Sequence, residues 1–171
     1  NTDGVAGADG SATSKDTTGV TVGAGVALNV VSSINEATVG AGATVNAGGL
    51  VLSADMTDVG GDKVSTVGAD AKSGAGGDKV GVAGSVAISV ADIRSMALVK
   101  GGAIVTLSGI GDVSLSASNT TLSTVTAQPD GIGAAADKVG VGASVALNIS
   151  NNATLAQVMD GATLTGALHD L

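Results

Sequence analysis

Residues 80–90 read Val80-Gly-Val-Ala-Gly-Ser-Val-Ala-Ile-Ser-Val90, with a large apolar side chain at nearly every second position. Similar stretches occupy residues 20–30 and residues 139–149, so the three copies are 60 and then 59 residues apart. Alternation with a period of two is typical of a β-strand whose two faces differ. A long internal repeat indicates a stacked array in which each unit packs against its neighbours.

The repeat extends through most of the chain, because residues 31–45 also recur and residues 50–54 resemble residues 113–117. We divide the chain into the tail of a preceding repeat (1–18), repeat 1 (19–78), repeat 2 (79–137) and a partial repeat 3 (138–171). We expect these parts to form one continuous array. Because the chain starts and stops out of phase, we expect either a piece of a longer array or a subunit whose repeat continues across a head-to-tail contact.

The two faces of each copy have different compositions, and we assign each face an environment. The Val, Leu and Ile side chains are expected to face the core, as in a half-buried strand. The other face carries only Gly, Ala, Ser, Thr and Asn, so we expect it to lie against another sheet or another chain, with an exposed flat face as the alternative. Val145→Asp should therefore abolish folding, whereas Ser144→Asp should disrupt assembly more than folding.

Strand signals dominate the rest of each unit, and glycine pairs such as Gly48-Gly49, Gly60-Gly61 and Gly101-Gly102 indicate turns between them. Hydrophobic residues make up 44% of the chain but none is aromatic, so any interior must be filled by small and branched side chains. A string of small sandwiches would normally need aromatic filling. We predict an all-β fold, a parallel β-solenoid (β-helix) of ~60-residue repeats with two or three coils each.

Charge and composition exclude several classes of function. Fifteen acidic residues against seven basic ones give a net charge of −8, and there is no basic patch or aromatic platform for nucleic acid. The uncharged residues 139–159 alternate with Gly, Ser and Asn and lack aromatic anchors, so we predict no membrane insertion. The chain has no cysteine, which leaves the compartment open.

The repeats resemble a known family. The residues that carry the resemblance are Val-Gly-Val-Gly-Ala-Ser-Val-Ala-Leu-Asn at 139–148, Ala156-x-Val158-x-x-Gly161-Ala162-x-Leu164, and Val-Ser-Leu-Ser-Ala at 113–117. They are similar to the repeats of large secreted bacterial adhesins, the filamentous-haemagglutinin-like and leukotoxin-like exoproteins. The resemblance implies a right-handed parallel β-helix, export through an outer-membrane transporter, and a place at the cell surface or in the medium. It supplies no binding residue.

Candidate chemistry is sparse. The single histidine, His169, has no second ligand type nearby, so neither a zinc site nor a catalytic triad can be assembled. Aspartates beside glycines, at Asp62, Asp78 and Asp130, suggest calcium, but the spacing of the known repeat motif is not met and a lysine follows the first two. The threonines of residues 120–126 do not recur in the other units. We therefore predict no catalytic, cofactor-binding or metal-binding residue, and no enzyme.

The sequence favours a structural segment of a secreted or cell-surface bacterial fibre or adhesin, acting as an extended rigid stalk. Its partners would be itself or neighbouring repeats of a longer chain, and a host or cell-surface glycan or protein. The alternative is a self-assembling filament subunit that stacks end to end or through its Gly/Ala/Ser face. A more distant alternative is a polysaccharide-acting β-helix enzyme, which would need clustered acids and aromatic stacking positions.

Overall fold

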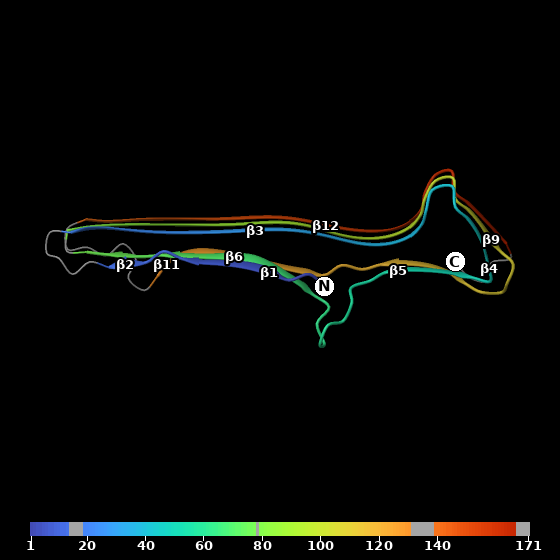
Figure 1. Ribbon diagram of the computed structural model, residues 1–171, viewed down its shortest axis with the longest axis horizontal. Helices are drawn as coiled ribbons and strands as arrows, with labels where there is room; N and C mark the ends of the chain where they lie inside the picture. The colour runs from blue at the N-terminus through green and yellow to red at the C-terminus, as the bar shows by residue number, and fades with distance from the viewer. Residues whose placement is uncertain (14–18, 78, 131–138, 167–171) are drawn as a thin grey trace.

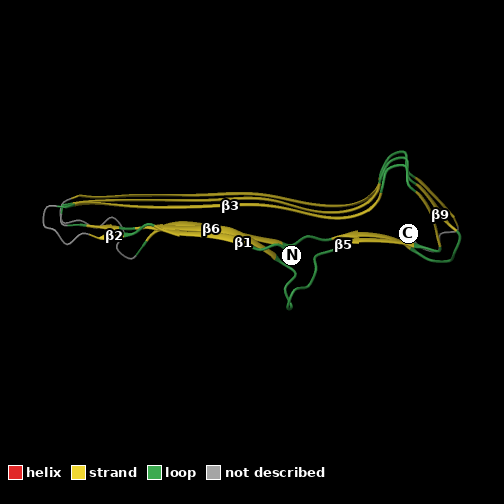
Figure 2. Ribbon diagram, viewed as in Figure 1, coloured by secondary structure: helices red, strands yellow, loops and turns green. Residues whose placement is uncertain are grey.

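The computed structural model describes residues 1–13, 19–77, 79–130 and 139–166, and within these ranges the chain is all-β, without a helix. Every sheet pairs its strands in parallel. Among the described residues there is accordingly no helix of the length and hydropathy needed to cross a membrane. Figure 2 shows strands and loops alone in two long, thin layers.

The largest sheet is built from the three copies of the opening repeat. Its strands are β3 (Val20–Val39), β8 (Val80–Val99) and β12 (Val139–Val158), in the order β12-β8-β3. Each copy lies beside the next with equivalent residues paired, so that Val80 is flanked by Val20 and Val139. These long strands form one layer of the molecule (Figure 1).

The remaining strands complete the circuit of the chain. They are β4 (Thr44–Ala47), β9 (Ile104–Leu107) and β13 (Thr163–Gly166) in one sheet, β5 (Leu50–Ala54) and β10 (Val113–Ala117) in a second, β1 (Gly4–Asp9), β6 (Ser65–Ser73) and β11 (Thr121–Pro129) in a third, and β2 (Ala12–Thr13) and β7 (Ala75–Gly76) in a fourth. The last three sheets return beneath the long strands as the second layer (Figure 1). β1, from the predicted tail of a preceding repeat, pairs with β6.

Each 60-residue unit makes one circuit, so the prediction of two or three coils per unit is wrong. The chain leaves β3 at Val39 and returns to the neighbouring strand at Val80, with no other strand between β3 and β8. The reason is the length of the opening strand, which takes 20 residues of each unit. The shorter strands that follow are the other walls of the same coil, not the strands of additional coils.

One turn recurs at equivalent positions in all three copies, where the long strand bends toward the next wall. Its glycines are Gly42, Gly102 and Gly161, with φ of 71°, 77° and 80°. In each copy the amide of the following alanine donates to the carbonyl three residues earlier, as Ala43 donates to Gly40 at 3.2 Å. This is the geometry of a type II turn, whose third residue requires a positive φ. Gly102 comes from a pair that the sequence indicated as a turn.

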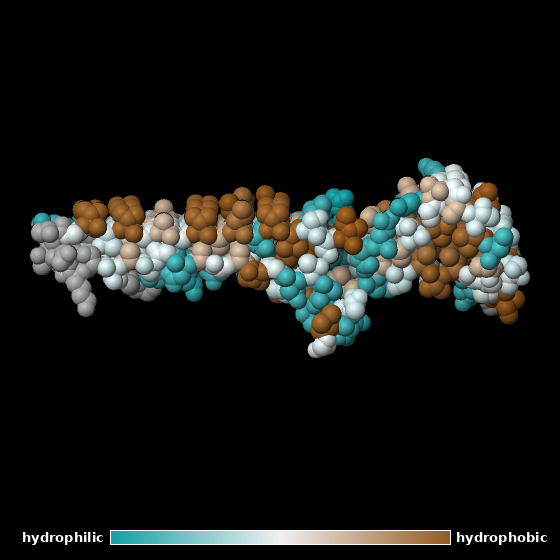
Figure 3. Space-filling model, viewed as in Figure 1, coloured by the Kyte–Doolittle hydropathy of each residue, from teal (hydrophilic) through white to brown (hydrophobic). Residues whose placement is uncertain are grey.

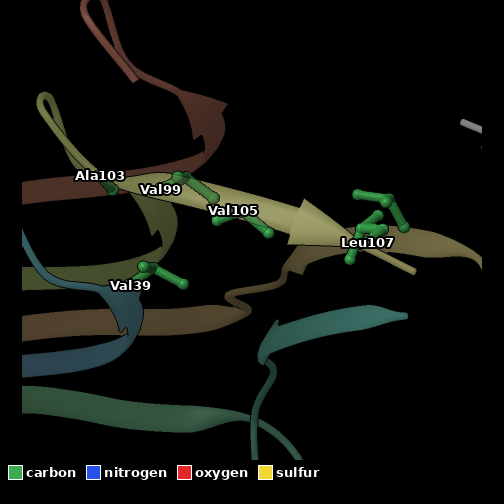
Figure 4. Packing of buried hydrophobic residues seen from close by; sticks show 6 residues of the cluster. Val39, Val99, Ala103, Val105 and Leu107 are labelled. Atoms are coloured by element: carbon green, nitrogen blue, oxygen red, sulfur yellow. The ribbon is translucent and has the colours of Figure 1, made fainter. Parts of the chain in front are cut away.

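The apolar core is thickest at the end of the molecule where this turn lies. Val39, Val99 and Val105 are buried there with Leu107 and Val113, and strands β4, β9, β5 and β10 surround them. Figure 4 shows Val99, Ala103 and Val105 along one edge of the cluster, with Val39 from the neighbouring coil close by. Equivalent valines of neighbouring repeats, such as Val39 and Val99, therefore stack in this end of the molecule.

Candidate interaction surface

The two layers of the thin part of the molecule meet through small side chains. The inner face of β8 carries Gly81, Ala83, Ser85, Ala87 and Ser89, all buried. Alanines oppose them from β6, namely Ala69 and Ala71. Sheets that pack through larger side chains lie about 10 Å apart; with Gly and Ala on both faces, these layers lie close together. The prediction that the small-residue face lies against another sheet is confirmed for β3 and β8.

Backbone contact between the layers explains the inner glycines of the first copy. A Cβ on Gly23 would overlap the carbonyl oxygen of Gly74, and a Cβ on Gly25 would overlap the carbonyl oxygen of Lys72. A strand glycine of this kind marks the close approach of another backbone. On β3 and β8 the Gly/Ala/Ser face is therefore occupied inside the chain and is not free to contact another copy, whereas on β12 the same face is exposed.

Polar side chains on the inner face tie the layers together. The Asn29 amide donates to the carbonyl of Gly4 at 2.7 Å, and the Thr21 hydroxyl donates to the carbonyl of Gly76 at 3.1 Å. Ser85 hydroxyl contacts the Ser144 hydroxyl at 2.8 Å within the long sheet. Buried polar groups need such partners, because an unpaired one costs free energy. Asn29, Thr21 and Ser85 have such partners, whereas the buried Ser89 hydroxyl makes no hydrogen bond.

The Val, Leu and Ile side chains of the repeat lie on the outside. On β3 the exposed fractions are 66% for Val26 and 68% for Val30, and on β12 they are 56% for Val145 and 50% for Ile149. The prediction that these side chains form the core is wrong. The physical reason is the close approach of the second layer opposite the repeat, where its inner face is mostly alanine and its backbone lies against Gly23 and Gly25. Branched side chains fit between the layers only at a few positions, such as Val67 and Ile93. Figure 3 shows the resulting apolar band along the long strands.

In-register pairing arranges this outer face in six rows of three residues across β3, β8 and β12. Five rows are large, with Val20, Val22, Val26, Leu28 and Val30 as their β3 members. The remaining row, which lies between Val22 and Val26, is Ala24, Gly84 and Ala143. The outer face is consequently two ridges of branched side chains separated by a shallow notch, which Figure 3 shows as a pale gap in the apolar band. We call this surface the valine face.

The valine face is large for a surface open to water. Its five large rows of three residues hold 15 side chains, each with roughly 50–100 Å² of apolar surface when fully exposed. Because these side chains are only partly exposed, the face leaves several hundred Å² in contact with solvent. Contiguous apolar patches of that size on soluble proteins mark sites of interaction. No charged residue occurs in residues 20–30, 80–90 or 139–149. The face is therefore suited to a flat apolar partner.

A polar segment ends the valine face. Arg94 forms a two-point ion pair with Asp92 on β8, through hydrogen bonds of 2.9 and 2.8 Å, and the Asn151 amide donates to Asp92 at 3.1 Å. One further ion pair, between Lys100 and Glu36 at 2.6 Å, links β3 to the residue after β8. These groups lie toward the thick end of the long strands and leave the apolar rows uncharged.

The outer face of the second layer is mainly polar, although Val5 and Leu122 are also exposed on it. Its members include Asp9, Asp70, Lys72, Thr124 and Gln128, which alternate with the inward alanines. A hollow of about 370 Å³ is lined by Gly7, Ala8, Asp9, Asp70 and Lys72. The molecule therefore presents one apolar and one mainly polar broad face.

A second polar feature surrounds Asp55, at the end of β5. Hydrogen bonds from Ser53, Ser118 and Ser116 lower the pKa of the Asp55 carboxyl below its ordinary value. The Asn35 amide donates to the Asp55 carbonyl at 2.9 Å, beside a small pocket of about 160 Å³. One exposed carboxylate held by serine hydroxyls keeps its charge to lower pH, but it does not form a metal site.

The positions that suggested chemistry are not brought together. Asp62 lies in an exposed loop, where its carboxylate accepts a hydrogen bond from the Val64 amide at 2.7 Å. His169 and Asp78 lie outside the described residues, as does Gly131 beside Asp130. Within the described ranges no group of three or more His, Cys, Asp or Glu side chains could hold a metal ion. The absence of a cofactor stays a prediction.

Sequence reasoning missed the valine face because it assigned the wrong side to the core. The signal lies in the closing segments, where Ala6 and Ala8, Ala69 and Ala71 alternate with polar residues. A strand whose inward residues are mostly alanine calls for a partner face of small residues. Comparisons with protein-family models, curated proteins and solved structures find no match for this chain.

Proposed function

We propose that the chain is a β-solenoid segment whose role is structural, as part of a secreted or cell-surface bacterial fibre or adhesin. The observation that carries the proposal is the stacking of equivalent residues over three successive circuits, as at Val20, Val80 and Val139. Such a stack distributes its stability over neighbouring repeats and can be extended by adding circuits. The resemblance to secreted adhesin repeats supports the location and a right-handed coil.

The stack gains length slowly along its axis. Adjacent strands are about 4.8 Å apart, so each 60-residue circuit adds only that distance. A stalk of about 100 Å would need roughly 20 circuits. The proposed role is thus that of a broad, flat rod whose sides offer much surface for each unit of length.

Insertion of one more repeat tests the proposal. A second copy of residues 80–138, placed between residues 138 and 139, should fold as a fourth circuit. Small-angle X-ray scattering should show the particle thicker by about 4.8 Å with its other two dimensions unchanged. The denaturant m-value should rise in proportion to the added buried surface.

The matched control is an insertion of the same 59 residues in shuffled order. It should add a flexible chain with no change in the m-value. If the ordered insertion behaved like the shuffled one, the repeat would not be a unit of stacking and the proposal would fail. Antibody labelling of intact producing cells tests the location separately.

End-to-end assembly of separate copies is a second candidate. β3 and β12 are the outer strands of the long sheet, and each pairs with β8 on one side only. An open parallel edge is a template for another strand. Filaments that lengthen with protein concentration in electron micrographs would favour this candidate, and particles of constant thickness would contradict it.

A further inference from the structure

We propose that the valine face is the interface for a second copy of the same chain, and that the two copies pair face to face with their stacking axes parallel. The inference deepens the proposed structural role, since it assigns a lateral partner to the stacked repeats. It starts from three properties of this face: its area, its lack of charge and the order of its rows.

The area of the face matches what a stable pair needs. A standard protein–protein interface takes about 800 Å² from each partner. The valine face leaves several hundred Å² of apolar surface in contact with water, and β3 alone contributes Val20, Val22, Val26 and Val30 with exposed fractions between 64% and 68%. Burying both copies of such a face removes this contact with water, which is the main driving force of association.

The distribution of charge favours a second copy over a charged partner. Although the chain carries a net charge of −8, none of it lies in the rows of the valine face. Asp9, Asp70 and Lys72 project from the opposite broad face. Two copies can therefore bring their apolar faces together while their charged faces remain in water.

The order of the rows selects the arrangement. Two flat faces can be related by a two-fold axis that runs either along the strands or along the stacking direction. An axis along the strands places each row against itself, so that the notch of Ala24, Gly84 and Ala143 meets another notch and leaves a void. An axis along the stacking direction reverses the row order.

Reversal makes the face self-complementary. At full overlap of the six rows, the notch row opposes the Val26, Val86 and Val145 row of the other copy, and the two outermost rows oppose each other. The ridge of one copy then enters the notch of the other at two places. Interfaces approach the packing density of protein interiors, so this arrangement is favoured.

The same arrangement keeps the stacking directions of the two copies parallel. Rotation about the stacking axis leaves β3, β8 and β12 in the same order in both copies. Pairing can thus continue along a longer stack of repeats, which would join two broad rods into one thicker fibre.

Two substitutions, one on each broad face, test the interface by analytical ultracentrifugation. The wild-type chain should be a dimer at micromolar concentration. Val86→Asp places a charge in the central ridge and should raise the Kd at least about 100-fold, because the charge is desolvated without a partner. Thr124→Asp adds the same charge to the exposed polar face and should leave the Kd unchanged. Circular dichroism verifies that each variant keeps its β-structure.

A substitution that fills the notch distinguishes the effect of the shape of the valine face on the Kd from the effect of its hydrophobicity. A Cβ on Gly84 has its nearest neighbour, the Ala143 carbonyl oxygen, at 3.7 Å, so the monomer has space for a side chain. Gly84→Val makes the face more apolar but removes the recess, and it should raise the Kd about tenfold or more. A lower Kd for Gly84→Val would contradict the ridge-in-notch pairing.

One spin label distinguishes the two arrangements. The chain has no cysteine, and Ser32 is exposed just beyond the apolar rows of β3. With stacking axes parallel, labels on Ser32→Cys of the two copies lie roughly 45–50 Å apart, at about 3.3 Å per residue. With the axis along the strands, the spacing of sheets and strands places them roughly 15 Å apart. With Val86→Asp added, the two copies should not pair, so no distance between their labels should be measurable.

The pairing of two copies and the structural role on which it rests can be contradicted by different results. A monomeric wild type at about 100 μM, or one that binds phosphatidylcholine vesicles instead of itself, would overturn the pairing while leaving the repeat-insertion test intact. A short label distance would overturn the parallel arrangement. Failure of the repeat insertion with an intact dimer would overturn the stacked array alone.

Discussion

Ser85 and Val86 are neighbours in β8 whose side chains project to opposite sides of the sheet. Ser85 is 1% exposed and its hydroxyl contacts Ser144 and the carbonyl of Gln128 at 2.8 and 3.3 Å, whereas Val86 lies on the valine face. Ser85→Asp should lower the free energy of unfolding by several kcal/mol, because it buries a charge without a partner. Val86→Asp should lower it by about 1 kcal/mol. Urea denaturation at a concentration where the chain is monomeric measures both.

This expectation reverses the one drawn from the sequence for Ser144 and Val145. Ser144→Asp should therefore cost more stability than Val145→Asp, but the difference should be smaller than for Ser85 and Val86, because the inner side chains of β12 are also exposed. If Val86→Asp unfolded the chain and Ser85→Asp did not, the assignment of inner and outer faces would be wrong.

The alternation of residues predicted that the faces of the repeat differ, but not which face turns inward. Hydrophobicity favours Val86 inside and Ser85 outside. The structure has the opposite arrangement because the partner layer, through Ala69 and Ala71, offers a shallow inner surface. The decision depends on residues far away in the chain, so a local pattern could not make it.

At the scale of elements, the recurring turn after each long strand rests on one backbone conformation. Gly42 has φ of 71°, while Gly40 in the same turn has no positive φ, and a Cβ on either glycine would meet nothing within 4 Å. Gly42→Ala should destabilise the chain by about 1–2 kcal/mol, the cost of a left-handed residue with a Cβ. Thermal unfolding compared with that of Gly40→Ala measures the difference.

Gly40→Ala is the matched control because it adds the same methyl group to the same turn without a strained φ. It should change the stability little, or raise it slightly by reducing the freedom of the unfolded chain. Equal effects of the two substitutions would mean that the turn does not depend on the left-handed glycine.

Strands and glycine turns could be predicted because their signals are local. The 20-residue length of β3, β8 and β12 could not, since the apolar alternation stops after Val30 while the strand continues to Val39. Pairing of equivalent residues in neighbouring circuits extends the strand through this polar part. The error in the number of coils follows from the same omission, because a shorter opening strand would leave more of each unit for additional coils.

At the scale of the whole molecule, three circuits form a slab that is long across the stack and thin along it (Figure 1). Neighbouring strands are about 4.8 Å apart, whereas a 20-residue strand spans about 65 Å. Such a slab has one thin interior, and the inner face of an additional circuit would bury only Gly, Ala and Ser side chains there. Lateral pairing through the valine face would bury more apolar surface than that inner face does.

Salt should strengthen the pairing of whole molecules. Each copy carries a net charge of −8, and these charges repel across a distance that is about 30 Å at 0.01 M salt but about 10 Å at 0.1 M. Because no ion pair spans the apolar rows, screening removes repulsion without weakening an attraction. The Kd from sedimentation equilibrium should therefore fall as sodium chloride is raised, and fall further in sodium sulfate, which strengthens apolar burial. Val86→Asp should stay monomeric under both conditions, and a Kd that rose with salt would show that charges, not the valine face, hold the copies together.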